Sequence, residues 1–222
     1  MRHFDEELED LQKLLLEMGG LVESAIHRAV SVLTARDVAL AQDVLRNEAR
    51  INQMEIEIDD FAVRLLALHQ PMAKDLRFLT AAIKINNDLE RMGDLAVNIV
   101  ERALTILRRP PVKPLIDIPQ MAKLVDSMVR NCLDSFVRRD GELARGVLLA
   151  DDAVDNLRSH TYGELAAFMQ NDPSAIPSSL DLIFVARNLE RIADHATNIA
   201  EDVLFLVQGI DVRHHSETQH SR

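Results

Sequence analysis

The feature that most constrains this chain is one helical segment that occurs twice. Residues 89–101 read "LERMGDLAVNIVE" and residues 189–201 read "LERIADHATNIAE", with eight of thirteen positions identical. Four shared polar residues fall within about 80° of arc on one helix face: Glu90, Asp94, Asn98 and Glu101 in the first copy. Acidic residues four apart on a helix repel one another, and the stripe contains no Lys or Arg. Something outside the helix is therefore expected to offset this repulsion.

The repeat extends over both halves of the chain. "MGGLVESAI" (18–26) matches "MAKLVDSMV" (121–129), and Arg36-Asp37 matches Arg139-Asp140, at the same offset of 103 residues. A repeat this long is no solenoid unit. Helical periodicity predicts six helices, at roughly 4–35, 37–69, 71–108, 118–138, 140–171 and 177–208. The predicted fold class is all-α, with two tandem pseudo-symmetric three-helix bundles.

The expected helix boundaries follow from local chemistry. Asp37 and Asp140 are suited to cap the second and fifth helices, and Pro71 and Pro177 suit the first turns of the third and sixth. Consecutive prolines in "RRPPVKP" mark the one clear linker. We therefore divide the chain into a first repeat, a proline-rich linker, a second repeat and a polar tail, at residues 1–109, 110–117, 118–208 and 209–222.

Composition limits the possible partners and the location. The net charge of −11 repels phosphate backbones, so we expect no nucleic acid, and metal ions or basic protein surfaces fit better. Cys132, the single cysteine, lies at core spacing and is interpreted as a buried apolar residue. The start of the chain is acidic, unlike a leader peptide. The longest run without a charged residue is nine residues, Leu65 to Ala73, where a spanning helix needs about 20. We expect a soluble cytoplasmic protein without membrane insertion.

A second acidic stripe lies on the second predicted helix. Its members fall within about 60° of arc: Glu48, Asn52, Glu55 and Asp59. In the second half, Asp151 and Asp155 match the first two, whereas Arg158 and Tyr162 stand at the places of Glu55 and Asp59. The stripes are expected on the bundle surface, away from core residues such as Leu89 and Ile51, where two helices present them side by side.

All-oxygen clusters suit hard cations such as Mg²⁺, Mn²⁺ or iron. The predicted metal ligands are Glu48, Asn52, Glu55, Asp59, Glu90, Asp94, Asp151, Asp155, Glu190 and Asp194. A solvated face is the alternative, but such faces usually intersperse Lys with Glu. Counting Glu101 and Glu201, the stripe charge is −6 in the first half, and −4 in the second if Arg158 points at the site. The first half should then hold metal more tightly.

Enzymatic chemistry finds little support. A di-iron oxidase bundle needs Glu-x-x-His motifs that face the core, and the sequence contains none. His195 replaces Leu95 of the first copy and is interpreted as incidental rather than as a ligand. Gly-rich phosphate loops, nucleophile elbows and Cys-x-x-Cys motifs are also missing from the sequence. We therefore predict that the protein is not an enzyme.

The chain resembles the PhoU family, the accessory and regulatory proteins of bacterial phosphate-specific transport. The resemblance runs from Phe4 to about His214. Its most specific segments are "QPMAKDLR" (70–77), "LERMGDLAVNI" (89–99), "AIPSSLDLIFVARNLERIADHATNI" (175–199) and "VQGIDVRH" (207–214). The family implies two multinuclear metal clusters, of iron, zinc, manganese or magnesium, held by Glu/Asp-x-x-x-Asp motifs. Those motifs fall at Glu90–Asp94 and Glu190–Asp194, backed by Glu55–Asp59 and Asp151–Asp155. Asn52 departs from the pattern.

The resemblance also implies a function and partners. The protein would restrain uptake and the phosphate-starvation response when phosphate is plentiful, by contacting the ATPase of the phosphate ABC transporter and a membrane sensor histidine kinase. A homodimer in the cytoplasm, partly at the inner face of the membrane, is expected. Two other classes stay open: a metalloenzyme, and a helical scaffold or accessory protein of another phosphate transporter whose acidic surfaces bind basic partners instead of metal.

Overall fold

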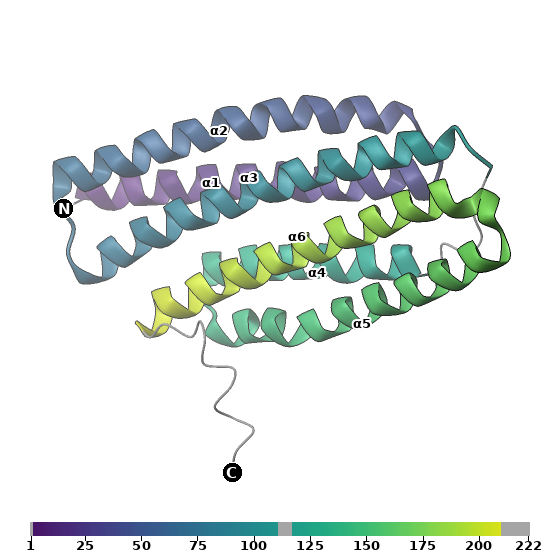
Figure 1. The fold of residues 1–222 in the computed structure, drawn as a ribbon. Coiled ribbons are helices and arrows are strands. Elements are labelled where there is room, and N and C mark those ends of the chain that lie inside the picture. Colours follow the sequence, from purple (N-terminus) through teal and green to yellow (C-terminus); the bar gives the residue numbers. More distant parts are fainter. Residues whose placement is uncertain (1, 111–116, 210–222) are drawn as a thin grey trace, which may run out of the picture.

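Six long helices form two bundles of three that lie against each other (Figure 1). The computed structural model describes residues 2–110 and 117–209. The helices of the first bundle are α1 (Arg2–Thr34), α2 (Ala39–His69) and α3 (Ala73–Leu107). Those of the second are α4 (Asp117–Arg138), α5 (Gly141–Asn171) and α6 (Ile176–Gln208), with a short 3₁₀ turn at Pro173–Ala175 before α6. No strand occurs in these residues, which confirms the all-α tandem architecture.

The turn between the first two helices has the same local chemistry in both halves. Asp140 caps α5 by accepting hydrogen bonds from two backbone N–H groups, and Asp37 accepts one from the first backbone N–H of α2 at 3.0 Å. The preceding residues, Arg36 and Arg139, both have left-handed backbones, with φ of 57° and 52°. Such a conformation costs a non-glycine residue about 1–2 kcal/mol. Its occurrence at equivalent positions shows that the repeat extends to backbone geometry.

The predicted helix starts differ from the structure in some places. Pro177 lies in the first turn of α6, as predicted. Pro71 does not open α3, because Met72 is extended, with φ of −115° and ψ of 150°, and the helix begins at Ala73. Reversing the chain between two antiparallel helices needs non-helical residues, and Pro71 and Met72 are two of them. The helix α4 begins at Asp117, the residue assigned to the end of the linker. The rest of that linker from 111 to 116, and the tail from 210 to 222, lie outside the described residues.

Each bundle has the apolar core that helical spacing predicts. Ile51, Met54 and Ile58 of α2 are fully buried, and so are the α3 core residues Leu89, Met92, Ala96 and Ile99. Phe61 is the exception, since it is only partly buried at the edge of the core. Cys132 is fully buried, and this burial raises the pKa of its thiol, so the side chain behaves as an apolar residue.

The two bundles meet mainly where α3 and α6 run side by side in opposite directions (Figure 1). Lys84 Nζ of α3 lies 2.7 Å from Asp202 Oδ1 of α6. Asp181 of α6 receives Arg109 Nη1 at 2.7 Å and Arg102 Nη1 at 3.3 Å, and both carboxylates are more than nine-tenths buried. The cations are partly exposed, but each buried carboxylate would be left unpaired if the halves moved apart, and an unpaired buried charge destabilises a fold. This junction therefore favours one relative position of the halves.

A second contact joins the halves between α1 and α4. A Cβ atom added at Gly19 of α1 would lie 2.6 Å from Leu133 Cδ1 of α4, so a side chain at this position would clash. The rings of Phe78 and Phe136 stack across the halves with centroids 5.7 Å apart. Within the described ranges, no helix is both long enough and apolar enough to cross a membrane.

Candidate metal centres

The first carboxylate cluster lies beside a close contact between α2 and α3. An added Cβ at Gly93 would lie 3.2 Å from Ile51 Cδ1, so the small residue lets the two helices approach. One turn away, Glu90 of α3 lies near enough to Asp94 and to Glu55 of α2 that their charges raise its pKa. Burial is the largest cause of that rise, and Arg91 opposes it. The structure therefore brings Glu55, Glu90 and Asp94 into one electrostatic unit.

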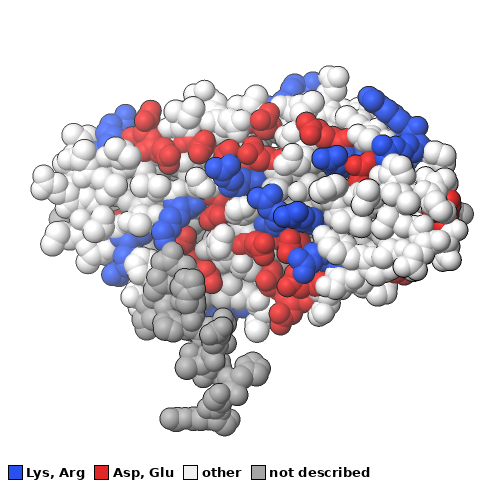
Figure 2. Space-filling model, viewed as in Figure 1, with Lys and Arg blue, Asp and Glu red and all other residues white. Residues whose placement is uncertain are grey.

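Glu90 and Glu190 lie deeper than the sequence predicts, whereas Asn98, Glu101 and Asp194 of the same stripes are exposed as predicted. Their stripe was expected on the bundle surface, opposite the core. Only 15% of the Glu90 side chain and 16% of its copy Glu190 are exposed, whereas Asp94 is 39% exposed. Side chains beside an apolar face are covered when the neighbouring helix packs closely. Figure 2 shows Asp and Glu in two groups on one face of the molecule, with Lys and Arg between them.

Asn86 is a residue of the first cluster that the sequence analysis missed. Its side chain is fully buried, and its Nδ2 donates to the backbone carbonyl of Glu55 and to Asp59 Oδ1, both at 2.9 Å. The amide thereby ties α3 to α2 and orients Asp59. Its position four residues before Glu90, in line with the acidic stripe, was the signal that could have found it.

Three buried oxygen atoms of the first cluster have no hydrogen-bond donor among the described residues: Glu90 Oε2, Asn86 Oδ1 and Asn52 Oδ1. Arg91 Nε lies 3.4 Å from Glu90 Oε2, but half of this arginine is exposed. A buried acceptor without a donor costs about 1–3 kcal/mol. A cation with oxygen ligands would satisfy such atoms, so the residues of the first cluster fit a hard metal ion.

Glu48 and Asn52 extend the same face of α2. Asn52 Nδ2 donates to Glu48 Oε1 at 3.1 Å, and both side chains are partly buried. The amide leaves its own oxygen as the buried acceptor described above. Asn52 therefore supplies an oxygen where an acid at this spacing would supply a carboxylate, with one negative charge fewer.

The second cluster lies between α5 and α6, and its carboxylates crowd one another. Burial, followed by the charges of Asp194 and Asp155, raises the pKa of Asp151 to about 6. Burial and Asp194 likewise raise the pKa of Glu190. Burial and Asp155 raise the pKa of Asp194. All four second-half carboxylates predicted as ligands therefore lie within electrostatic reach of one another.

Arg158 points into this second cluster. Its Nη1 donates to Glu190 Oε1 at 2.5 Å, and its Nη2 lies 3.6 Å from Asp155 Oδ1. The guanidinium also lies 5.9 Å from the ring centroid of Tyr162. The sequence left the orientation of Arg158 open, and the structure decides it. Arg158 is held closer to its carboxylates than Arg91 is in the first cluster, where the distances are 3.4 Å to Glu90 and 3.9 Å to Asp94. The second cluster therefore fits an added metal ion less well than the first.

The last two polar residues of the repeated stripe on α6, Asn198 and Glu201, face the other half of the molecule. Asn198 and Glu201 line a cavity of about 360 Å³ between α3 and α6, together with Lys84 and Asp88. Asp88 Oδ1 accepts from Asn198 Nδ2 at 3.4 Å and contacts His195 Nδ1 at 2.8 Å. The predicted stripe therefore divides into a pair that faces α5 and a pair that faces α3. His195 joins the two halves.

Comparisons with known proteins agree with the repeated architecture. The PhoU domain model matches this chain twice, over residues 15–103 and 118–203. The chain belongs to the PhoU family. All ten predicted ligand positions lie inside the two matched segments.

Relatives in this family are similar over nearly their whole length. The phosphate-specific transport system accessory protein PhoU homolog of Pseudomonas aeruginosa is 42% identical over 96% of this chain and 88% of its own. The Aquifex aeolicus homolog is 41% identical, with 94% of each chain covered. The crystal structure of P. aeruginosa PhoU covers 93% of this chain and all of its own with a TM-score of 0.91. The regulatory protein PhoU from Streptococcus pneumoniae is 30% identical, covers 94% of this chain and 99% of its own, and has a TM-score of 0.88.

Proposed function

We propose that this chain is a metal-binding accessory protein of phosphate transport, which restrains the phosphate ABC transporter and the phosphate-starvation response when phosphate is plentiful. The observation that carries the proposal is the PhoU match in both halves, with relatives named as accessory proteins of phosphate-specific transport. Those relatives are similar from end to end, so the proposed role concerns the whole chain rather than one domain.

Metal binding is the part of the proposal that rests on geometry. Glu55, Asp59, Glu90 and Asp94 would hold the first ion or ions, with Glu48 and Asn52 beside them, and the buried oxygens without donors support this. Asp151, Asp155, Glu190 and Asp194 would hold the second set, in competition with Arg158. Oxygen ligands favour magnesium, manganese or iron, and zinc also accepts them. Each bound ion would supply positive charge that joins two helices.

The proposed partners are the transporter's ATPase and a membrane sensor histidine kinase, met by a homodimer of this chain at the inner face of the membrane. The relatives' printed role in a transport system supports association with a transporter. Two separate carboxylate groups on one face offer a contact surface whose charge depends on metal occupancy (Figure 2). Bound metal ions make this face less negative, so it attracts a basic partner less strongly and an acidic partner more strongly. Metal occupancy would therefore set the strength of the contact.

The decisive test is genetic. A strain without this protein, grown in phosphate-rich medium, should express phosphate-starvation genes, because a brake has been removed. A promoter fusion to a reporter enzyme measures this expression, and the wild-type gene on a plasmid should restore repression. Normal repression in the deletion strain would contradict the proposed role.

A scaffold whose acidic surfaces bind basic partners directly is the second candidate. Arg158 favours it, because an arginine already occupies the second cluster and a partner's arginine can do the same in the first. Elemental analysis of protein purified without chelator, followed by a pull-down from membranes, separates the two. The variant Glu90→Gln/Asp94→Asn should lose bound metal under our proposal. Metal content equal to that of the wild type would instead favour the scaffold.

A matched control exists on α1. Glu6 and Asp10 have the same Glu-x-x-x-Asp spacing, but their side chains are 68% and 61% exposed. The variant Glu6→Gln/Asp10→Asn therefore makes the same change of charge without touching a buried cluster. It should retain the metal content of the wild type.

A further inference from the structure

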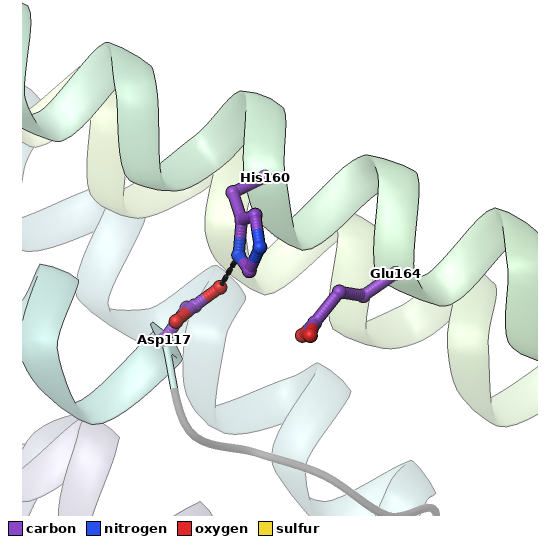
Figure 3. A group of neighbouring side chains, drawn as sticks. All are labelled: Asp117, His160 and Glu164. Carbon is purple, nitrogen blue, oxygen red and sulfur yellow. Dashed lines mark hydrogen bonds and ion pairs between the residues drawn. The ribbon is translucent and has the colours of Figure 1, made fainter.

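A group of three potential metal ligands lies in the second half, apart from the acidic clusters (Figure 3). Asp117 lies at the start of α4, and His160 and Glu164 lie one turn apart on α5. One ligand atom from each lies within 4.8 Å of the other two. His160 is about 200° around α5 from Arg158, so the group faces away from the second cluster.

Asp117 is the anchor of this group. Its side chain is only 11% exposed, and it lies in the first turn of α4, where the helix dipole stabilises a carboxylate. Its Oδ2 contacts His160 Nδ1, which holds the imidazole ring in one orientation and raises the pKa of His160. Two helices thus present a buried carboxylate and an oriented ring to the same point.

Glu164 completes the group without a partner of its own. Figure 3 shows its carboxylate directed toward the space beside the ring and Asp117. Among the described residues, it has no hydrogen-bond or ion-pair partner, and its charge adds to the rise in the pKa of His160. Two carboxylates therefore converge on one imidazole, and only that of Asp117 contacts the ring.

We propose that Asp117, His160 and Glu164 form a site for a borderline transition-metal ion, Zn²⁺ or one like it. Imidazole nitrogen and carboxylate oxygen are both donors that zinc accepts, and three protein ligands leave the fourth position of an open site for water. Bonds of about 2.0–2.2 Å in a tetrahedron place ligand atoms about 3.4 Å apart. Rotations of the exposed His160 and Glu164 side chains close the difference from 4.8 Å.

The nitrogen ligand separates this site from the carboxylate clusters. Imidazole suits zinc, copper and nickel, whereas carboxylates alone suit magnesium, calcium and manganese. The ion would join the first turn of α4 to the middle of α5, at the point where the second half begins. The site does not depend on the proposed role in phosphate transport.

The test is a Zn²⁺ titration of the full chain in competition with a chromophoric chelator. The variant His160→Gln should bind one equivalent of Zn²⁺ less than the wild type. Glu164→Gln should bind that equivalent at least about tenfold more weakly. With Co²⁺, the wild type should show the visible absorption of a four-coordinate ion, and His160→Gln should lose it.

Two controls make the result specific. His69 Nε2 contacts Glu7 Oε2 at 2.8 Å, a histidine–carboxylate pair that belongs to no three-ligand group in the described residues, so His69→Gln should bind as much Zn²⁺ as the wild type. A variant with the tail histidines His214, His215 and His220 replaced by Gln should also bind as much Zn²⁺ as the wild type. The proposal is overturned if His160→Gln keeps that equivalent at unchanged affinity, or if only the tail variant loses it.

Discussion

The two carboxylate clusters of this protein share a repeated helix but differ in their source of positive charge. The first brings Glu55, Glu90 and Asp94 together, and Asn86 links Asp59 to them. Three of its buried oxygens accept no hydrogen bond from the described residues: Glu90 Oε2, Asn86 Oδ1 and Asn52 Oδ1. The second gathers four acids, and Arg158 lies among them in contact with Glu190 and Asp155. The first half also has an arginine, but Arg91 is 54% exposed and lies 3.4 Å from Glu90 Oε2 and 3.9 Å from Asp94 Oδ2, whereas Arg158 is 30% exposed and contacts Glu190 directly. The built-in cation is therefore looser in the first half than in the second.

Most of this difference comes from the helix that faces the repeat. On α5, Arg158 and Tyr162 stand where α2 has Glu55 and Asp59, and on α6, Ala186 stands where α3 has Asn86. The Glu-x-x-x-Asp pair is unchanged. A duplicated motif thus specifies where carboxylates lie, but the partner helix decides their net charge and their unsatisfied hydrogen-bonding capacity.

The largest expected effect is a difference in metal affinity between the halves. The first half should bind more tightly, because affinity in oxygen sites rises with the number of charged ligands and the exposed Arg91 is held less closely there than Arg158 is in the second half. The variant Glu90→Gln/Asp94→Asn should lose the tightest ion, whereas Glu190→Gln/Asp194→Asn should keep it. Isothermal titration with Mn²⁺ measures both. Equal affinities, or tighter binding in the second half, would contradict this interpretation.

Reversing the charge of Arg158 should make the second half resemble the first. Arg158→Glu introduces the residue type of the equivalent Glu55 position, and we expect second-half affinity to rise by about tenfold or more. Arg158→Gln, which only removes the charge, should give a smaller rise. The reciprocal Glu55→Arg should weaken the first half. Titrations of these variants that match the wild type would show that the guanidinium does not compete with metal.

Without metal, the same substitution should have opposite effects in the two halves. Glu90→Gln removes a mostly buried carboxylate from beside Asp94 and Glu55, so it should stabilise the chain by about 0.5 kcal/mol. Glu190→Gln deprives Arg158 of its closest carboxylate, so it should destabilise by about 1 kcal/mol. Urea unfolding in the presence of a chelator measures both free energies. Effects of the same sign would mean that Arg158 does not satisfy the second cluster.

The smallest expected effect is a pH dependence centred on Asp151 in the second half. Folding raises the pKa of Asp151 from 3.8 to about 6, so the folded chain binds more protons between these values. The free energy of unfolding of the metal-free protein should therefore fall as the pH rises from about 4 to 6. Solvent screening of this partly exposed group keeps the change below about 1 kcal/mol. Asp151→Asn should flatten the dependence, and an unchanged slope would assign it to other groups.

Helical periodicity predicted the fold because burial of one apolar face is a local, repeating property. The core positions Ile51, Leu89 and Met92 were predicted this way and are fully buried. The capping role of Asp140 was also predictable, since a capping side chain contacts only the first turn of its own helix. Pro71 misled the prediction of the helix start, because the direction of the chain reversal depends on how α2 and α3 pack.

The candidate sites were only partly predictable, because they depend on contacts between helices. The pairs Glu90–Asp94 and Glu190–Asp194 were visible as repeats. Asn86 donates to Asp59, 27 positions away along the chain, and His160 contacts Asp117, 43 positions away. Helical spacing within one segment cannot predict contacts between segments so far apart. The sequence also did not show that the stripe on α6 faces two different helices. Glu190 and Asp194 face α5, whereas Asn198 and Glu201 face α3, because α6 packs between these two helices.

The amino-acid sequence by itself determined six helices, a tandem repeat, an apolar core and the register of the paired acids, since each follows from the periodicity of a helix. Only the tertiary structure decided which carboxylates are buried and which cation faces them. Burial and charge pairing depend on the surfaces that neighbouring helices bring together. Arg158 shows the difference, because its place in the repeat was readable, but its contact with Glu190 exists only once α5 lies against α6.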